Sequence, residues 1–102
     1  DLFEREPRLD QAARISDQLE AELSAARNIP GVRDVRIKGA IGVIELAELR
    51  DNDLLKRRFV EAGVWIRPFR NIVYTTPPLV IDSDDLSTLC ATMVDVVRTH
   101  LA

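Results

Sequence analysis

Arg67 is the residue best placed for chemistry in this chain, within the run GVWIRPFRNIVYTTPPLVI that extends from Gly63 to Ile81. Residues 64–66 favour an extended backbone, and Pro68 disfavours helix in the residue before it, so we expect Arg67 at the end of a strand. Few carboxylates lie near it in the sequence. A guanidinium offers a planar pair of donors that matches a carboxylate, so the pattern indicates a clamp for the carboxylate of a bound ligand. The alternative is an ordinary solvated or ion-paired arginine.

Side chains that could act as catalysts are few and poorly placed. His100 is expected in the last turn of the last helix, where a solvated role or an interaction with the helix dipole is the simpler interpretation. Cys90 falls on the apolar stripe of that helix and is expected to pack as a small core residue. Lys38 and Lys56 lie at polar positions that do not favour Schiff-base chemistry. The sequence therefore predicts recognition, with no catalytic residue, cofactor site or metal site in these residues.

Composition restricts the classes of protein that fit. The chain has 102 residues, 46% of them hydrophobic, which suits one globular domain. No apolar run is long enough to span a bilayer, and a net charge of −3 gives no basic face for nucleic acid. The single cysteine permits no internal disulfide and favours the cytoplasm. A charged start without methionine or a signal peptide suggests a piece of a longer protein.

Three helices are expected to position the candidate site. Apolar residues at helical spacing predict an amphipathic helix over residues 9–26, which ends near Asn28 and has Pro7 in its first turn. A short helix is expected from Asp51 or Asn52 to residue 62, with Gly63 as its stop signal. The closing helix is expected to begin at residues 82–85, which are three aspartates and Ser83. Negative charge stabilises a helix N-terminus, so a metal site is the weaker interpretation of these aspartates.

Three strands are expected between those helices. Residues 32–45 alternate in polarity and predict one strand, straight or bent, in which Gly39 and Gly42 mark a bulge or a close approach of another backbone. Residues 64–67 and 72–76 predict a hairpin with its turn at 68–71. Trp65 is expected on the same side as Arg67, where packing under a helix is favoured over contact with a ligand.

The segments GAIGVIEL (39–46) and FVEAGVWIRPFRNIVYTTPPLVI (59–81), followed by the amphipathic closing helix, resemble the C-terminal segment of class III pyridoxal-phosphate-dependent aminotransferases. The likeness spans nearly the whole chain and is most specific over residues 58–81. The WIRPF run is most similar to the 7,8-diaminopelargonate synthase family of biotin biosynthesis.

That resemblance implies a fold type I enzyme whose small C-terminal α+β domain, here residues 1–102, has an antiparallel-rich sheet with helices packed on one face. It implies that a large domain of the same polypeptide binds pyridoxal 5'-phosphate through a lysine, in a cytoplasmic homodimer. The family uses S-adenosylmethionine as amino donor and 7-keto-8-aminopelargonate as acceptor. On this resemblance, Arg67 binds the carboxylate of the keto acid, and Phe69 lines the site. The chain alone is not expected to catalyse the reaction.

Two alternatives remain open. The chain could belong to another class III omega-aminotransferase with a different donor or acceptor. It could also be a free-standing α+β module that binds an unrelated small acid. A domain taken from a larger enzyme is expected to expose apolar surface that its partner domain would cover.

Overall fold

The computed structural model describes residues 2–48, 51–64 and 66–101, and within them the side chains of residues 2–9 and of Arg67 are outside the description. Trp65, and with it the expectation about its packing, lies outside the described residues. The elements follow in the order α1 (Leu2–Leu23), a 3-10 turn η1 (Ser24–Asn28), β1 (Val32–Lys38), β2 (Ile41–Leu46), α2 (Asn52–Glu61), β3 (Arg67–Phe69), β4 (Ile72–Thr75) and α3 (Ser83–Leu101).

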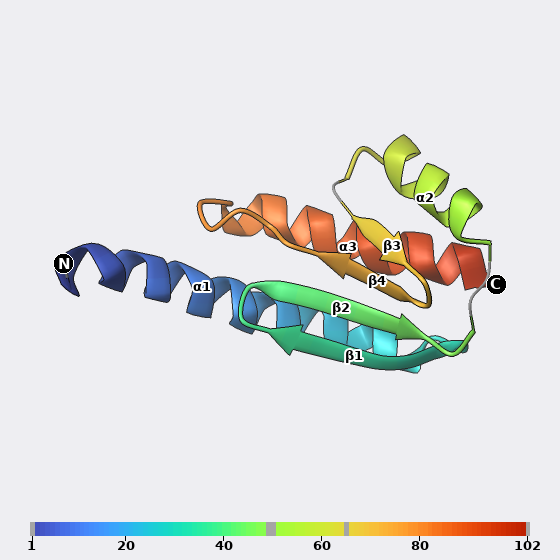
Figure 1. The fold of residues 1–102 in the computed structure, drawn as a ribbon, viewed down its shortest axis with the longest axis horizontal. Coiled ribbons are helices and arrows are strands. Elements are labelled where there is room, and N and C mark those ends of the chain that lie inside the picture. The colour runs from blue at the N-terminus through green and yellow to red at the C-terminus, as the bar shows by residue number, and fades with distance from the viewer. Residues whose placement is uncertain (1, 49–50, 65, 102) are drawn as a thin grey trace.

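The four strands form one antiparallel sheet in the order β1-β2-β4-β3. Helices α1 and α3 lie side by side against one face of this sheet, and α2 packs against β3 and α3 (Figure 1). This arrangement confirms the predicted α+β fold with an antiparallel sheet and helices on one face. No helix within residues 2–48, 51–64 and 66–101 is both long and apolar enough to cross a membrane.

The core lies between the sheet and the two long helices, where apolar side chains at helical spacing meet the inward-facing residues of the strands. Gly42 of β2 shows how closely α1 approaches, because a β-carbon at this position would lie 2.7 Å from Leu23 Cδ1. The sequence predicted a bulge or the approach of another backbone at Gly42, whereas the atoms that come close to it belong to side chains. The largest fully buried side chains include Ile15, Leu19, Leu23, Ile44, Leu46, Leu55, Phe59, Val73, Leu86 and Met93.

The prediction of one strand over residues 32–45 was wrong. The segment forms the hairpin of β1 and β2, in which Lys38 pairs directly with Ile41. Gly39 takes a φ of 57°, the left-handed conformation that glycine adopts without a steric cost. A two-residue turn preserves the alternation of polarity along the chain, so the alternation alone did not reveal the reversal.

Capping residues predict where the helices begin and end better than the spacing of apolar residues does. The side chain of Asp51 accepts a hydrogen bond from Leu54 N at 3.2 Å and begins α2, while Gly63 follows its end with a φ of 76°. Asp82 accepts from Asp85 N at 2.8 Å at the start of α3. The first helix begins at Leu2 instead of residue 9, so the expected first-turn position of Pro7 was wrong. Residues 2–8 are mostly charged and give no apolar stripe from which that start could be predicted.

The predicted hairpin after α2 is present, with shifted bounds. Strand β3 covers Arg67–Phe69, whereas the prediction placed the strand at 64–67 and began the turn at residue 68. Pro68 can occupy β3 because this strand lies at the edge of the sheet, where one backbone N–H is not needed for pairing. The turn falls at Arg70, which has a φ of 55°.

Candidate functional site

Arg67 is the first residue of β3, and its Cα partner across the antiparallel pair is Tyr74 of β4. The other predicted site residue, Phe69, ends the same strand and pairs with Ile72. Phe69 is 59% exposed, and the guanidinium carbon of Arg70 lies 5.7 Å from the centre of its ring. The two predicted residues therefore share one edge strand, on which the Phe69 ring remains accessible to a ligand.

Two asparagines anchor the turn that follows Phe69. Asn52, at the start of α2, donates through Nδ2 to the backbone oxygen of Arg70 at 2.7 Å. Asn71 donates through Nδ2 to Leu46 O at 3.0 Å, and Leu46 N donates back to Asn71 O at 2.6 Å. These bonds attach the β3–β4 hairpin to both α2 and β2, so the short edge strand is held in place. The sequence signals used to predict the elements did not identify either contact.

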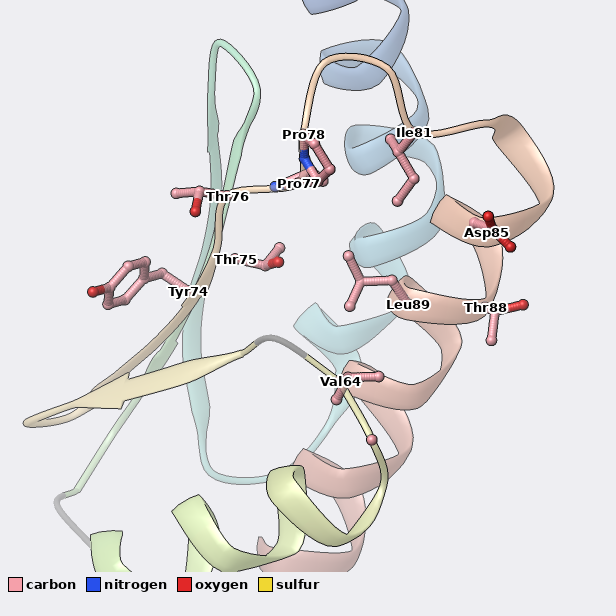
Figure 2. Close-up of a pocket in the computed structure, with 11 residues that line it drawn as sticks. Val64, Tyr74, Thr75, Thr76, Pro77, Pro78, Ile81, Asp85, Thr88 and Leu89 are labelled. Carbon is pink, nitrogen blue, oxygen red and sulfur yellow. The ribbon is translucent and has the colours of Figure 1, made fainter.

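A cleft of about 700 Å³ opens between the end of β4 and the first turns of α3. Side chains of Thr75, Ile81 and Leu89 point into the space between the two elements, whereas the ring of Tyr74 points away from α3 (Figure 2). The lining is mostly apolar, with several hydroxyl groups and one carboxylate. It consists of Gly63, Val64, Tyr74, Thr75, Thr76, Pro77, Pro78, Ile81, Asp85, Thr88 and Leu89.

Helix α1 holds the segment between β4 and α3, which forms one wall of this cleft. It does so through two polar side chains that the sequence patterns did not identify. Arg14 donates to Ile81 O at 2.5 Å and to Ser83 Oγ at 3.1 Å. Gln18 donates to Ser83 O at 2.8 Å and to Ser87 Oγ at 3.0 Å. The connection from β4 to α3 is thus held by residues that lie more than 60 positions earlier in the chain.

The residues with possible catalytic chemistry lie elsewhere. Cys90 is 1% exposed, and burial, together with the charge of Glu22, raises the pKa of its thiol to about 12. Its predicted role as a small core residue is confirmed. His100 lies in the last turn of α3, as expected, but it is 8% exposed, so the solvated alternative was wrong, and the interaction with the helix dipole stays a prediction.

The described residues do not fit a pyridoxal phosphate site. Lys38 ends β1 and Lys56 lies on α2, and both are exposed outside the cleft, so neither can be a buried Schiff-base lysine. Within the described part of the chain, no three His, Cys, Asp or Glu side chains converge as metal ligands. What the geometry offers is an anchored edge strand and a preformed cleft, and both suit binding.

The family model described as Aminotransferase class-III matches residues 1–97. The chain is 42% identical over 86 residues to the adenosylmethionine-8-amino-7-oxononanoate aminotransferase of Mycobacterium leprae, covering 84% of this chain and 20% of that protein. It is 38% identical over 88 residues to the protein of the same name from Corynebacterium glutamicum, covering 86% of this chain and 21% of that protein. The chain thus spans about a fifth of the length of these relatives.

Solved structures give the same fold at lower identity. An omega transaminase from Pseudomonas jessenii superimposes with a TM-score of 0.84 at 20% identity, over 97% of this chain and 24% of that one. The adenosylmethionine-8-amino-7-oxononanoate aminotransferase from Methanocaldococcus jannaschii superimposes with a TM-score of 0.82 at 22% identity. The match covers 97% of this chain and 25% of that one. In both cases the match covers about a quarter of the solved chain.

Proposed function

The chain belongs to the class III aminotransferase family, and from this premise we propose that it is the small C-terminal domain of an adenosylmethionine-8-amino-7-oxononanoate aminotransferase of biotin biosynthesis. The observation that carries the proposal is the 42% identity over 86 residues to a relative of that name. The longer protein would convert 7-keto-8-aminopelargonate to 7,8-diaminopelargonate with S-adenosylmethionine as amino donor.

In this proposal the 102 residues bind one end of the keto acid and close the site, while chemistry takes place on a large domain of the same polypeptide. Pyridoxal 5'-phosphate on that domain supplies the chemistry of amino-group transfer. The parent is a cytoplasmic homodimer. The chain alone is inactive, because Lys38 and Lys56 are both exposed and neither lines the cleft.

Arg67 is proposed as the residue that binds the substrate carboxylate, with Phe69 beside it as part of the lining. Its place on β3 supports the proposal, because the hairpin is held to α2 and β2 by Asn52 and Asn71. A binding group is most effective when its backbone is held in place before the ligand arrives. The exposed ring of Phe69 offers apolar surface to the aliphatic part of the same substrate.

The test is a donor and acceptor screen on the purified full-length parent. We expect formation of 7,8-diaminopelargonate from the keto acid, with S-adenosylmethionine preferred over simple amines and amino acids. Turnover of other omega-amines without turnover of this keto acid would assign the chain to another class III aminotransferase. If the reading frame upstream of Asp1 encodes no large domain with a lysine for the cofactor, the free-standing binding module replaces the enzyme.

A further inference from the structure

Two residues with β-carbons take a left-handed backbone conformation next to the candidate site. Arg70, in the turn between β3 and β4, has a φ of 55°, and Asp51, just before α2, has a φ of 42°. Such a conformation costs free energy in a residue with a β-carbon, so it persists only where neighbouring contacts hold it. One contact joins the two places, because Asn52 follows Asp51 and its Nδ2 donates to Arg70 O at 2.7 Å. This bond is therefore part of what keeps the turn in its conformation.

The side chain of Asn52 is not needed to begin its own helix. The N-cap of α2 is Asp51, whose side chain accepts a hydrogen bond from Leu54 N at 3.2 Å. The amide of Asn52 bonds instead to a turn 18 positions later in the chain. A carbonyl oxygen can only accept, so the amide faces Arg70 O with its nitrogen. Its oxygen, Oδ1, is buried and accepts no hydrogen bond from the described residues. The turn at Arg70 is thus the contact that this amide serves.

Strand β3 depends on such a contact because it is short and lies at the edge of the sheet. It has three residues, and its neighbour in the sheet is β4. Its last residue, Phe69, precedes Arg70, whose guanidinium carbon lies 5.7 Å from the centre of the Phe69 ring. Asn71 attaches the β4 side of the turn to β2. Asn52 supplies the anchor on the β3 side, so a shift of Arg70 would move the Phe69 ring and the strand that carries it.

We propose that Asn52 is a positioning residue for the substrate site, which acts through the turn at Arg70 on the strand that carries Arg67 and Phe69. The inference rests on the proposed function in taking Arg67 as the residue that binds the substrate carboxylate. A strand that is held before the substrate arrives need not be ordered on binding. Displacement of a binding group by about 1 Å can cost on the order of a hundredfold in rate. Loss of the Asn52 donor should therefore be visible in kcat/KM for the keto acid.

The first experiment compares two substitutions in the first turn of α2 in the full-length parent. Asn52→Asp keeps the shape of the side chain and replaces the donor with a second acceptor facing Arg70 O. Negative charge stabilises a helix N-terminus, so α2 itself should remain. Asp53→Asn is the matched control, because Asp53 is exposed in the same turn. We expect kcat/KM for the keto acid to fall about tenfold or more in Asn52→Asp and to stay at the parent's value in Asp53→Asn. Equal values in the two variants would overturn the inference.

A double-mutant cycle separates positioning from a general loss of stability. If Asn52 acts through the strand that carries Arg67, Asn52→Asp should lower kcat/KM far less in an Arg67→Ala background than in the parent. Losses that simply add would mean that Asn52 acts elsewhere, and they too would overturn the inference. The absorbance of the bound cofactor and the unfolding midpoint show whether each variant is folded. Asn52→Ala removes the donor without adding a charge, and it takes the place of Asn52→Asp if that variant does not fold.

Hydrogen exchange in the full-length parent tests the same contact without substrate. The backbone amides of residues 69–72 should exchange faster in Asn52→Asp than in the parent, while those of β1 should not change. Unchanged exchange at residues 69–72 would overturn the inference. If the parent transfers amino groups to a different keto acid, the double-mutant cycle is measured on that substrate. Failure of the biotin-pathway assignment is in this way distinguished from failure of the positioning role.

Discussion

Arg67 and Tyr74 face each other as Cα partners across β3 and β4, and Tyr74 also belongs to the lining of the cleft beside α3. One pair of residues therefore connects the edge strand proposed to bind the substrate with the cleft. Displacement of β4 would move the backbone of Arg67 with it, because the antiparallel ladder couples the two strands. The proposed substrate site and the cleft beside α3 are therefore coupled through the pairing of β3 with β4.

In the full-length parent, Arg67→Ala is expected to lower kcat/KM for the keto acid by the equivalent of about 2 to 5 kcal/mol, the range for losing one partner of a buried charge pair. Arg67→Lys should recover only part of the loss, because an ammonium group cannot reproduce the planar pair of donors. Steady-state kinetics measure kcat/KM for both variants. The absorbance of the bound cofactor should be the same in each variant as in the parent.

Arg57→Ala is the matched control for this prediction, since Arg57 is exposed on α2 and lies outside the cleft lining and β3. Its kinetics should equal those of the parent. Unchanged kinetics in Arg67→Ala would remove the carboxylate clamp from the proposal while leaving the family assignment intact.

Local chemistry made much of the fold predictable from the sequence. Asp51, Gly63 and Asp82 are capping or stop residues, and they place the ends of α2 and the start of α3 correctly. The β1–β2 reversal was missed because Lys38 and Ile41 pair across a tight turn that continues the alternation of polarity. Periodicity reports which face a side chain occupies and does not report the direction of the chain.

The candidate site was predictable only where one segment of the chain forms it. Arg67 could be placed on a strand next to a proline from its immediate neighbours, and β3 includes it. The cleft joins residues 63–64, 74–78 and 81–89. The bond from Arg14 to Ile81 O spans 67 positions of sequence. Contacts between distant segments depend on the packed fold, and no local pattern encodes them.

Gly42→Ala is expected to destabilise the fold by about 1 to 3 kcal/mol, the usual cost of adding a methyl group to a packed core. The new β-carbon would lie 2.7 Å from Leu23 Cδ1 and 3.4 Å from Leu19 Cδ2, so the buried Leu23 side chain would have to shift. Gly39→Asn is the control, because its site is open and asparagine tolerates a φ of 57°. Urea denaturation measures both, and equal midpoints for the two variants would contradict the close packing of α1 on β2.

Arg14→Ala is expected to cost about 1 to 3 kcal/mol, because it removes a charged donor and leaves Ile81 O without that bond. The backbone amides of residues 79–83 should exchange hydrogen faster, while those of β1 should not change. Arg98→Ala is the control, since Arg98 makes an exposed ion pair with Asp95 at 3.4 Å, and such pairs contribute about 0 to 1 kcal/mol. Equal exchange in both variants would mean that α1 does not hold the cleft wall.

Cys90 should be inert to thiol reagents in the native protein and reactive once the chain unfolds. Burial raises the pKa of its thiol to about 12, so almost no thiolate forms at neutral pH. The folded state holds this proton more tightly than the unfolded chain, whose thiol titrates near about 8.5. The stabilisation is therefore complete below about pH 8.5 and is lost as pH rises toward about 12, with a slope of at most about 1.4 kcal/mol per pH unit. Cys90→Ala should lack that slope when unfolding free energies are measured across this range. A native thiol that reacts at pH 8 as fast as an unfolded one would show that α1 and α3 do not exclude solvent from it.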